Sequence, residues 1–206
     1  MKISVFLLLL TFGIFCISCG ETKTAKNAPA TVKKGVAPIA DDEIAVIEME
    51  NSSAYGTIKM ELYSNIAPNM VARFKELAKE GVYNGTTFHR INQTVIQGGD
   101  PNSKDADPSN DGMGGSNKAN ISAEFSDIPY DTGIVGAARS QDINSSNAQF
   151  FIMLKREPAF DNKYIIFGKV IDGMNNVRTI SGASPKEGER PIEDIRIKSV
   201  TIQPKN

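Results

Sequence analysis

The sequence is poor in several residue types, and each shortage excludes a class of function. Among 206 residues there is no tryptophan, one histidine (His89) and two cysteines (Cys16 and Cys19). One histidine cannot supply an H-E-x-x-H zinc site, and no G-x-S-x-G nucleophile elbow is present. The 23 basic residues are balanced by 24 acidic ones, and no basic cluster is interleaved with aromatic residues. Nucleic acid is therefore not an expected partner.

Both cysteines lie in an N-terminal segment that differs from the rest. Lys2 is followed by the apolar run ISVFLLLLTFGIF, which is shorter than the roughly 20 residues that a membrane-spanning helix needs. This pattern is typical of a secretory signal peptide. The run ends in CISCG, where Ser18 and Cys19 resemble a bacterial lipobox. We expect residues 1–18 to be a signal peptide and Cys19 to be lipidated, with ordinary cleavage nearby as the alternative.

The remaining chain divides into a polar segment and one domain. Residues 20–40 contain no aromatic residue and are rich in Ala, Lys, Thr and Pro, so we expect 19–40 to form the lipidated cysteine and a flexible tether. Residues 41–206 have the length of a single domain. A chain without cysteines beyond the leader suits an oxidising compartment. We expect a bacterial cell-envelope protein, held to a membrane by lipid, with its domain in the periplasm or at the cell surface.

Alternation of apolar and polar residues predicts several strands. In GTIKMELY, Ile58, Met60 and Leu62 share one face. The run IAVIEME precedes it, and NSSAYG between the two indicates a hairpin turn. QFFIML and YIIFGKV are further strand candidates. In IRIKSVTI the apolar phase shifts by one residue, which predicts a β-bulge at Ser199.

Two segments have helical periodicity. Residues 68–81 place Val71, Phe74, Leu77 and Ala78 on one stripe. They begin with Pro and end with Gly, as helices often do. Residues 172–182 form a shorter helical pattern. Many strands and two helices without βαβ alternation predict a mainly β protein, a closed antiparallel barrel with helices capping its ends.

Several motifs occur together in the order and spacing of one known family. They are FHRI…QGGD at 88–100, GMGG at 112–115, AEF at 123–125, TGIVGAAR at 132–139, QFFI at 149–152 and FGKV at 167–170. Over residues 44–202 the chain resembles the cyclophilin-type peptidyl-prolyl cis-trans isomerases. The resemblance implies a cyclophilin-like barrel of eight antiparallel strands and an enzyme that needs no cofactor or metal. It also implies that the partners are proline-containing segments of unfolded or folding proteins, here envelope proteins, and we expect a monomer.

This activity explains an arginine beside the only histidine. Rotation about an X-Pro bond is slow because amide resonance creates a barrier of about 18–20 kcal/mol. A fixed guanidinium can donate a hydrogen bond to the nitrogen of the twisted amide, and so favours the transition state. The resemblance implies that Arg90 is this catalytic residue. Consecutive strand residues point to opposite faces, so we expect His89 to be a structural, hydrogen-bonded residue.

The resemblance also implies the substrate-binding residues. Gln97 is expected to hold the substrate backbone, Phe151 to form the floor of the proline pocket, and the backbone of Ala138 and Arg139 to pair with the extended peptide. Further residues are expected at the apolar wall of the pocket or as structural neighbours of the site. At the wall are Val95, Phe160 and Tyr164, and the structural neighbours are Phe88, His89 and Phe150.

One segment departs from the family pattern. Six residues, INQTVI, separate Arg90 from Gln97, where the family usually has seven. Counted back from Gln97, Val95 replaces a long apolar side chain, and Thr94 replaces a Phe that helps to enclose the proline. This shortening leaves an alternative open, a cyclophilin-like peptide-binding or chaperone module with little turnover.

Overall fold

The computed structural model describes residues 30–183 and 188–205. The expected signal peptide, Cys19 and the first part of the expected tether lie outside the described residues. The strands are β1 (Val32–Lys33), β2 (Glu43–Met49), β3 (Thr57–Leu62), β4 (Arg90–Ile91), β5 (Val95–Gly98), β6 (Phe125–Ser126), β7 (Ile134–Ala137), β8 (Phe150–Met153), β9 (Ile165–Asp172) and β10 (Ile197–Pro204). The helices are α1 (Ser52–Tyr55), α2 (Pro68–Lys79) and α3 (Met174–Ser181), with short 3₁₀ turns at Pro101–Lys104, Pro108–Asn110 and Pro158–Phe160.

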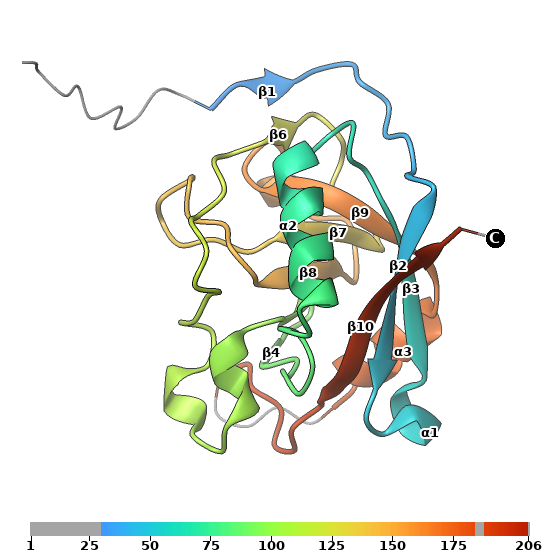
Figure 1. The fold of residues 1–206 in the computed structure, drawn as a ribbon, viewed down its shortest axis with the longest axis vertical. Helices are drawn as coiled ribbons and strands as arrows, with labels where there is room; N and C mark the ends of the chain where they lie inside the picture. Colours follow the sequence, from blue (N-terminus) through green and yellow to red (C-terminus); the bar gives the residue numbers. More distant parts are fainter. Residues whose placement is uncertain (1–29, 184–187, 206) are drawn as a thin grey trace, which may run out of the picture.

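Eight strands form one strongly curved sheet (Figure 1). Their order is β10-β2-β3-β9-β7-β8-β5-β4, and each neighbouring pair is antiparallel. This confirms the predicted mainly β fold with eight antiparallel strands. The predicted closure of the barrel is wrong, because β10 and β4 are the two edges and do not pair with each other. The sheet is an open half-barrel.

At the open edge, β4 has only 2 residues. The segment just before it approaches the start of β10 instead. Gly85 N donates to Ile197 O at 2.8 Å, Ile197 N to Thr86 O at 2.8 Å, and Phe88 N to Ile195 O at 3.0 Å. A few backbone hydrogen bonds therefore bridge the gap without a continuous ladder.

The predicted hairpin and bulge are confirmed. β2 pairs with β3, with Ile47 opposite Ile58. Their connection contains the single helical turn α1, and Gly56 follows it at φ +61°. The register of β10 against β2 shifts between Ile197 and Ser199, where the apolar phase changes in the sequence.

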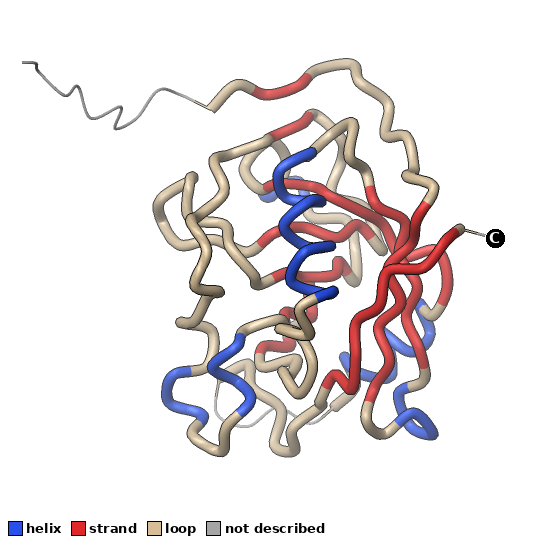
Figure 2. The backbone as a smooth tube through the Cα atoms, viewed as in Figure 1, coloured by secondary structure: helices blue, strands red, loops and turns tan. Residues whose placement is uncertain are grey.

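Helix α2 lies across the concave face of the sheet (Figures 1 and 2). Its buried residues include the predicted stripe, and Gly81 follows the helix at φ +69°. The carboxylate of Glu124 accepts hydrogen bonds from Asn69 N and Met70 N at 3.1 and 3.0 Å, so it satisfies first-turn donors that lack helical partners. None of the helices described here is long and apolar enough to span a membrane.

The main core fills the space between α2 and the concave face. Phe74 of α2 packs against Phe150 and Phe167, with ring centroids 5.7 and 5.3 Å apart. Helix α3, the second predicted helix, contributes Val177 and Ile180 to the same core. A second, smaller cluster lies on the convex face of the sheet. The candidate active site is built on that face.

Residues 30–40 were expected to belong to a flexible tether, but they lie along the domain. β1 pairs with β6 in parallel, with Val32 opposite Phe125. Lys33 Nζ donates to the carbonyl oxygens of Asn65 and Ile66 at 3.2 and 2.7 Å. The described part of the expected tether is therefore attached to the domain.

Candidate active site

Three neighbouring strands bring the predicted site residues into one row on the convex face. Arg90 of β4 lies opposite Gln97 of β5, and Gln97 lies opposite Phe151 of β8. Side chains of directly opposed residues point to the same face of a sheet. The alternate residues Ile96 and Phe150 point into the main core, where both are 0% exposed.

Arg90 is accessible, and two of its three guanidinium nitrogens are held by protein groups. Nη1 donates to Gln97 Oε1 at 3.2 Å, and Nε donates to the carboxylate of Glu189. Glu189 lies in the loop between α3 and β10. The Arg90 side chain is 44% exposed. A ligand can therefore approach a guanidinium whose orientation is already restrained.

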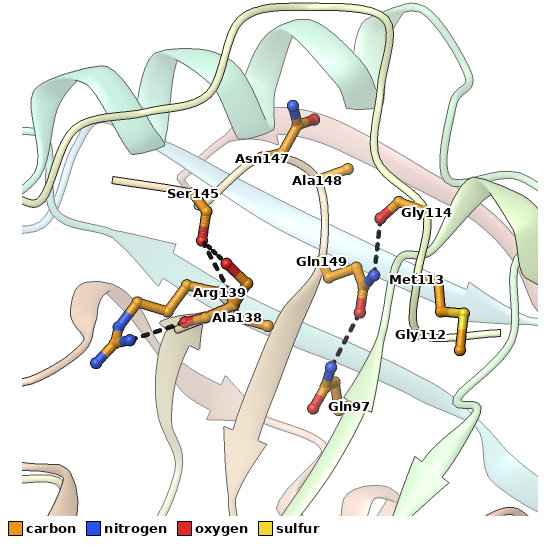
Figure 3. Close-up of a pocket in the computed structure, with 11 residues that line it drawn as sticks. Gln97, Gly112, Met113, Gly114, Ala138, Arg139, Ser145, Asn147, Ala148 and Gln149 are labelled. Atoms are coloured by element: carbon orange, nitrogen blue, oxygen red, sulfur yellow. Dashed lines mark hydrogen bonds between the residues drawn. The ribbon is translucent and has the colours of Figure 1, made fainter. Parts of the chain in front are cut away.

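Gln97 continues this network away from Arg90. Its Nε2 donates to Gln149 Oε1 at 2.9 Å, and Gln149 Nε2 donates to Gly114 O at 2.8 Å (Figure 3). The chain of hydrogen bonds runs from Arg90 through two glutamines to the loop of the GMGG motif. These hydrogen bonds fix the orientation of the side-chain amide groups of Gln97 and Gln149.

Phe151 is the centre of an aromatic cluster beside this network. Its ring is stacked on Tyr130 at 5.9 Å and meets the rings of Phe160 and Tyr164 edge-on at 5.6 and 5.7 Å. The Phe151 ring also approaches Gly136 of the neighbouring strand β7, where a Cβ would lie 2.4 Å from Phe151 Cζ. Glycine at 136 is therefore what allows the Phe151 ring to lie close to the sheet.

The cluster covers the expected floor of the pocket. Phe151 is 3% exposed and Val95, in the same cluster, is 2% exposed. Phe160 and Tyr164 are half-buried at its edge. Two hollows border the site, and neither is lined by an aromatic residue of this cluster. One contains Gln97, Gly112, Met113, Gly114, Ala138, Arg139, Ser140, Ser145, Asn147, Ala148 and Gln149 (Figure 3), and the other contains His89, Arg90, Gln97, Asp111, Gly112, Met113, Arg139, Gly188, Glu189 and Arg190.

Arg139 connects these hollows to the aromatic cluster. Its guanidinium carbon lies 4.6 Å from the centroid of the Tyr164 ring, in a cation–π contact. Nε donates to Lys163 O at 3.1 Å, and Nη1 to Ser140 O at 2.8 Å. The backbone N–H of Ala138 donates to Gln149 O at 2.9 Å, so this donor is already used inside the protein.

The three residues expected as structural neighbours are all buried. Phe88 and Phe150 are 0% exposed and meet edge-on in the main core at 6.2 Å. His89 is 6% exposed, which agrees with a structural residue. The expected hydrogen bond is not found, since neither ring nitrogen of His89 has a partner among the described residues. Burial lowers the pKa of His89, and the nearby carboxylate of Asp100 opposes this effect in part.

The shortened segment between Arg90 and Gln97 forms a tight turn organised by one side chain. Asn92 Oδ1 accepts hydrogen bonds from Thr94 N and Val95 N at 2.8 and 2.9 Å. Asn92 N donates to Val95 O at 3.0 Å. The turn closes the β4–β5 hairpin and keeps Arg90 in register with Gln97. Thr94 is half-buried beside it.

Four further residues shape the site and were not identified from the sequence. Gln149 is the first residue of the QFF motif. Its position two residues before Phe151 is the sequence signal that could have placed its amide near Gln97. Gly136 and Tyr130 become relevant only once the position of Phe151 is known. Glu189 comes from a loop 99 residues away from Arg90, and no local pattern indicates that contact. Among the described residues, no three His, Cys, Asp or Glu side chains are grouped so as to hold a metal ion.

Comparison with known proteins identifies the family of the chain. Residues 46–202 match the family model described as cyclophilin type peptidyl-prolyl cis-trans isomerase/CLD. A probable peptidyl-prolyl cis-trans isomerase of Brucella suis is 40% identical over 153 residues, covering 72% of this chain and 78% of the relative. The peptidyl-prolyl cis-trans isomerase ppi1 of Schizosaccharomyces pombe is 35% identical, covering 75% of this chain and 96% of its own length.

A solved structure shows the same fold. The cyclophilin-type peptidyl-prolyl cis-trans isomerase of Cryptosporidium parvum, crystallised in the presence of the dipeptide Ala-Pro, is 31% identical with a TM-score of 0.69. The match covers 78% of this chain and 98% of that one. The chain therefore belongs to the cyclophilin-type peptidyl-prolyl cis-trans isomerase family, and its activity is peptidyl-prolyl cis-trans isomerisation.

Proposed function

We propose that Arg90 accelerates rotation about X-Pro bonds by stabilising the twisted amide. As the bond rotates, conjugation is lost and the proline nitrogen becomes a hydrogen-bond acceptor. A guanidinium restrained beforehand gains more from this nitrogen than from the planar amide, which is selective binding of the transition state. The observation that carries the proposal is the exposed Arg90 guanidinium held at Nη1 by Gln97 and at Nε by Glu189.

The substrate is held on both sides of this guanidinium. Gln97 offers its carboxamide to the peptide backbone, next to Arg90 in the row. The proline ring rests against the aromatic cluster around Phe151, with Val95 and Phe160 as the adjoining apolar surface. Because Phe151 is 3% exposed, a proline reaches its ring only when Tyr164 or Phe160 moves outward. The backbone at 138–139 and the side chain of Tyr164 border the same approach.

A protease-coupled assay with an X-Pro peptide tests the role of Arg90. Arg90→Ala should lower kcat/KM at least about 100-fold, because the donor to the twisted amide is removed. Arg90→Lys should fall nearly as far, since lysine keeps the charge but lacks the planar fork. Lys59→Ala on β3, an exposed cation that pairs with Asp172 of β9, is the control.

Retention of wild-type kcat/KM by Arg90→Ala would refute this mechanism. Near-background rates for the wild-type protein and the variant alike would favour a peptide-binding or chaperone module over an efficient enzyme. A folded variant, shown by an unchanged thermal midpoint, is required for either conclusion.

We further propose that the enzyme acts as a lipid-anchored monomer on exported proteins of the cell envelope. The apolar run followed by Ser18 and Cys19, and the lack of cysteine after Cys19, support this location. The intact mass of protein extracted from membranes should correspond to a chain that begins at an acylated Cys19. Cys19→Ala should release the protein from the membrane fraction, and a wild-type mass without acyl groups would contradict the proposal.

A further inference from the structure

Glu189 is attached to the strand that carries Arg90 at three points. Its backbone O accepts from Ile91 N at 2.6 Å. Oε1 accepts from Asn92 Nδ2 at 2.8 Å, and Oε2 accepts from Arg90 Nε. Each carboxylate oxygen therefore has its own donor, and the two donors are two residues apart in the same hairpin. An exposed ion pair made by two free side chains has no such support.

The donors that meet Glu189 are themselves held in place. Asn92 Oδ1 accepts hydrogen bonds from the backbone of Thr94 and Val95 in the tight turn. With the amide held in this way, Asn92 Nδ2 points toward the Glu189 carboxylate. Partial burial raises the pKa of Glu189, but the hydrogen bonds from Asn92 and Arg90 outweigh this and hold the pKa below its ordinary value. The carboxylate is consequently charged at neutral pH.

The contacts leave one nitrogen of Arg90 available. Nε is taken by Glu189 and Nη1 by Gln97, whereas Nη2 makes no hydrogen bond with any residue that the structure describes. A planar guanidinium fixed at two nitrogens has its third in a defined direction. The shortened turn, through Asn92, and the α3–β10 loop, through Glu189, thus determine how Arg90 is presented.

We propose that Glu189 is a positioning residue for isomerisation, which holds the Arg90 guanidinium so that Nη2 is the donor to the substrate. The inference rests on the proposed role of Arg90 and identifies the contact that fixes the orientation of its guanidinium. Without the carboxylate, Arg90 samples other rotamers, and the fraction of molecules ready for the twisted amide falls.

Glu189→Gln separates positioning from folding of the loop. Glutamine keeps an oxygen for Asn92 Nδ2, but its amide nitrogen cannot accept from Arg90 Nε. We expect kcat/KM to fall about tenfold through kcat, with an unchanged thermal midpoint. In ¹⁵N NMR spectra the Arg90 Nε–H should exchange with solvent faster than in the wild type. Glu193→Gln changes an exposed carboxylate in the same loop and should alter neither quantity.

A double-mutant cycle with Arg90→Ala shows whether Glu189 acts through Arg90. The double variant should be no slower than Arg90→Ala alone. Wild-type or increased activity of Glu189→Gln beside an impaired Arg90→Ala would overturn the role of Glu189 and leave that of Arg90 intact. An equal loss from Glu189→Gln in both backgrounds would also overturn it. Full activity of Arg90→Ala would overturn both proposals.

Discussion

Two pairs of adjacent residues, His89–Arg90 and Phe150–Phe151, each combine a buried side chain with a member of the site row. His89 and Phe150 are both buried, at 6% and 0% exposure. Phe150 lies in the main core, whereas His89 lines the hollow that also holds Arg90. Arg90 and Phe151 belong to the row on the convex side. In Phe150–Phe151, strand alternation thus places one ring in the main core and the other in the site.

The two faces differ in what surrounds these residues. Phe150 contacts the rings of Phe74, Tyr83 and Phe88 in the main core. Phe151 packs in a smaller aromatic cluster whose rim is half-buried, and the glutamine network borders it. The concave face is specialised for stability and the convex face for binding, so substitutions on the two faces should have separable effects.

The largest stability effect should come from Phe150. Phe150→Ala leaves a cavity where four rings meet, and we expect the free energy of unfolding to fall by about 3 to 5 kcal/mol. Phe151→Ala should lose less stability, since the half-buried rings at the rim can close in, but more kcat/KM. Urea denaturation and the isomerase assay on both variants measure this. If Phe150→Ala and Phe151→Ala lost the same stability and the same activity, the two faces would not differ in function as described.

Gly136 offers a way to disturb the convex face alone. Gly136→Ala puts a methyl group where a Cβ would lie 2.4 Å from Phe151 Cζ. We expect the ring to be displaced, with a loss of about 1 to 3 kcal/mol from overpacking and a clear fall in kcat/KM. A crystal structure of the variant with the Phe151 ring unmoved and full activity would show that this close approach is unimportant.

His89 should make a smaller, pH-dependent contribution to the free energy of unfolding. Burial lowers the pKa of His89 below the ordinary 6.5, so the unfolded chain binds a proton more readily than the folded protein. The free energy of unfolding should therefore decrease as the pH falls through about 6.5. His89→Leu should lack this dependence. The charges of Asp100 and Arg190, which act on the His89 side chain, remain in place in this variant. The same slope in both proteins would exclude His89 as its cause.

Local patterns predicted the secondary structure well, because each strand and helix leaves a periodic signal. The hairpin of β2 and β3, the stripe of α2 and the bulge before Ser199 all follow from alternation or spacing within a dozen residues. The row of Arg90, Gln97 and Phe151 was implied by motifs that resemble a known family. The structure places these three residues opposite one another on adjacent strands.

Features that depend on distant contacts could not be predicted in this way. The open edge lies between β4 and β10, and whether these strands pair depends on the path of the chain around them. The attachment of residues 30–40 depends on β6, and the Arg90–Glu189 contact joins segments 99 residues apart. The covering of Phe151 results from how four aromatic rings pack, which composition does not specify.

The central claim is that catalysis depends on the guanidinium of Arg90 on the convex face. Exchange NMR at equilibrium measures the cis–trans interconversion of an Ala-Pro peptide directly, without a coupled protease. With catalytic amounts of wild-type protein the exchange rate should rise far above the uncatalysed rate, and with folded Arg90→Ala it should return close to that rate. Undiminished exchange with Arg90→Ala would contradict the account.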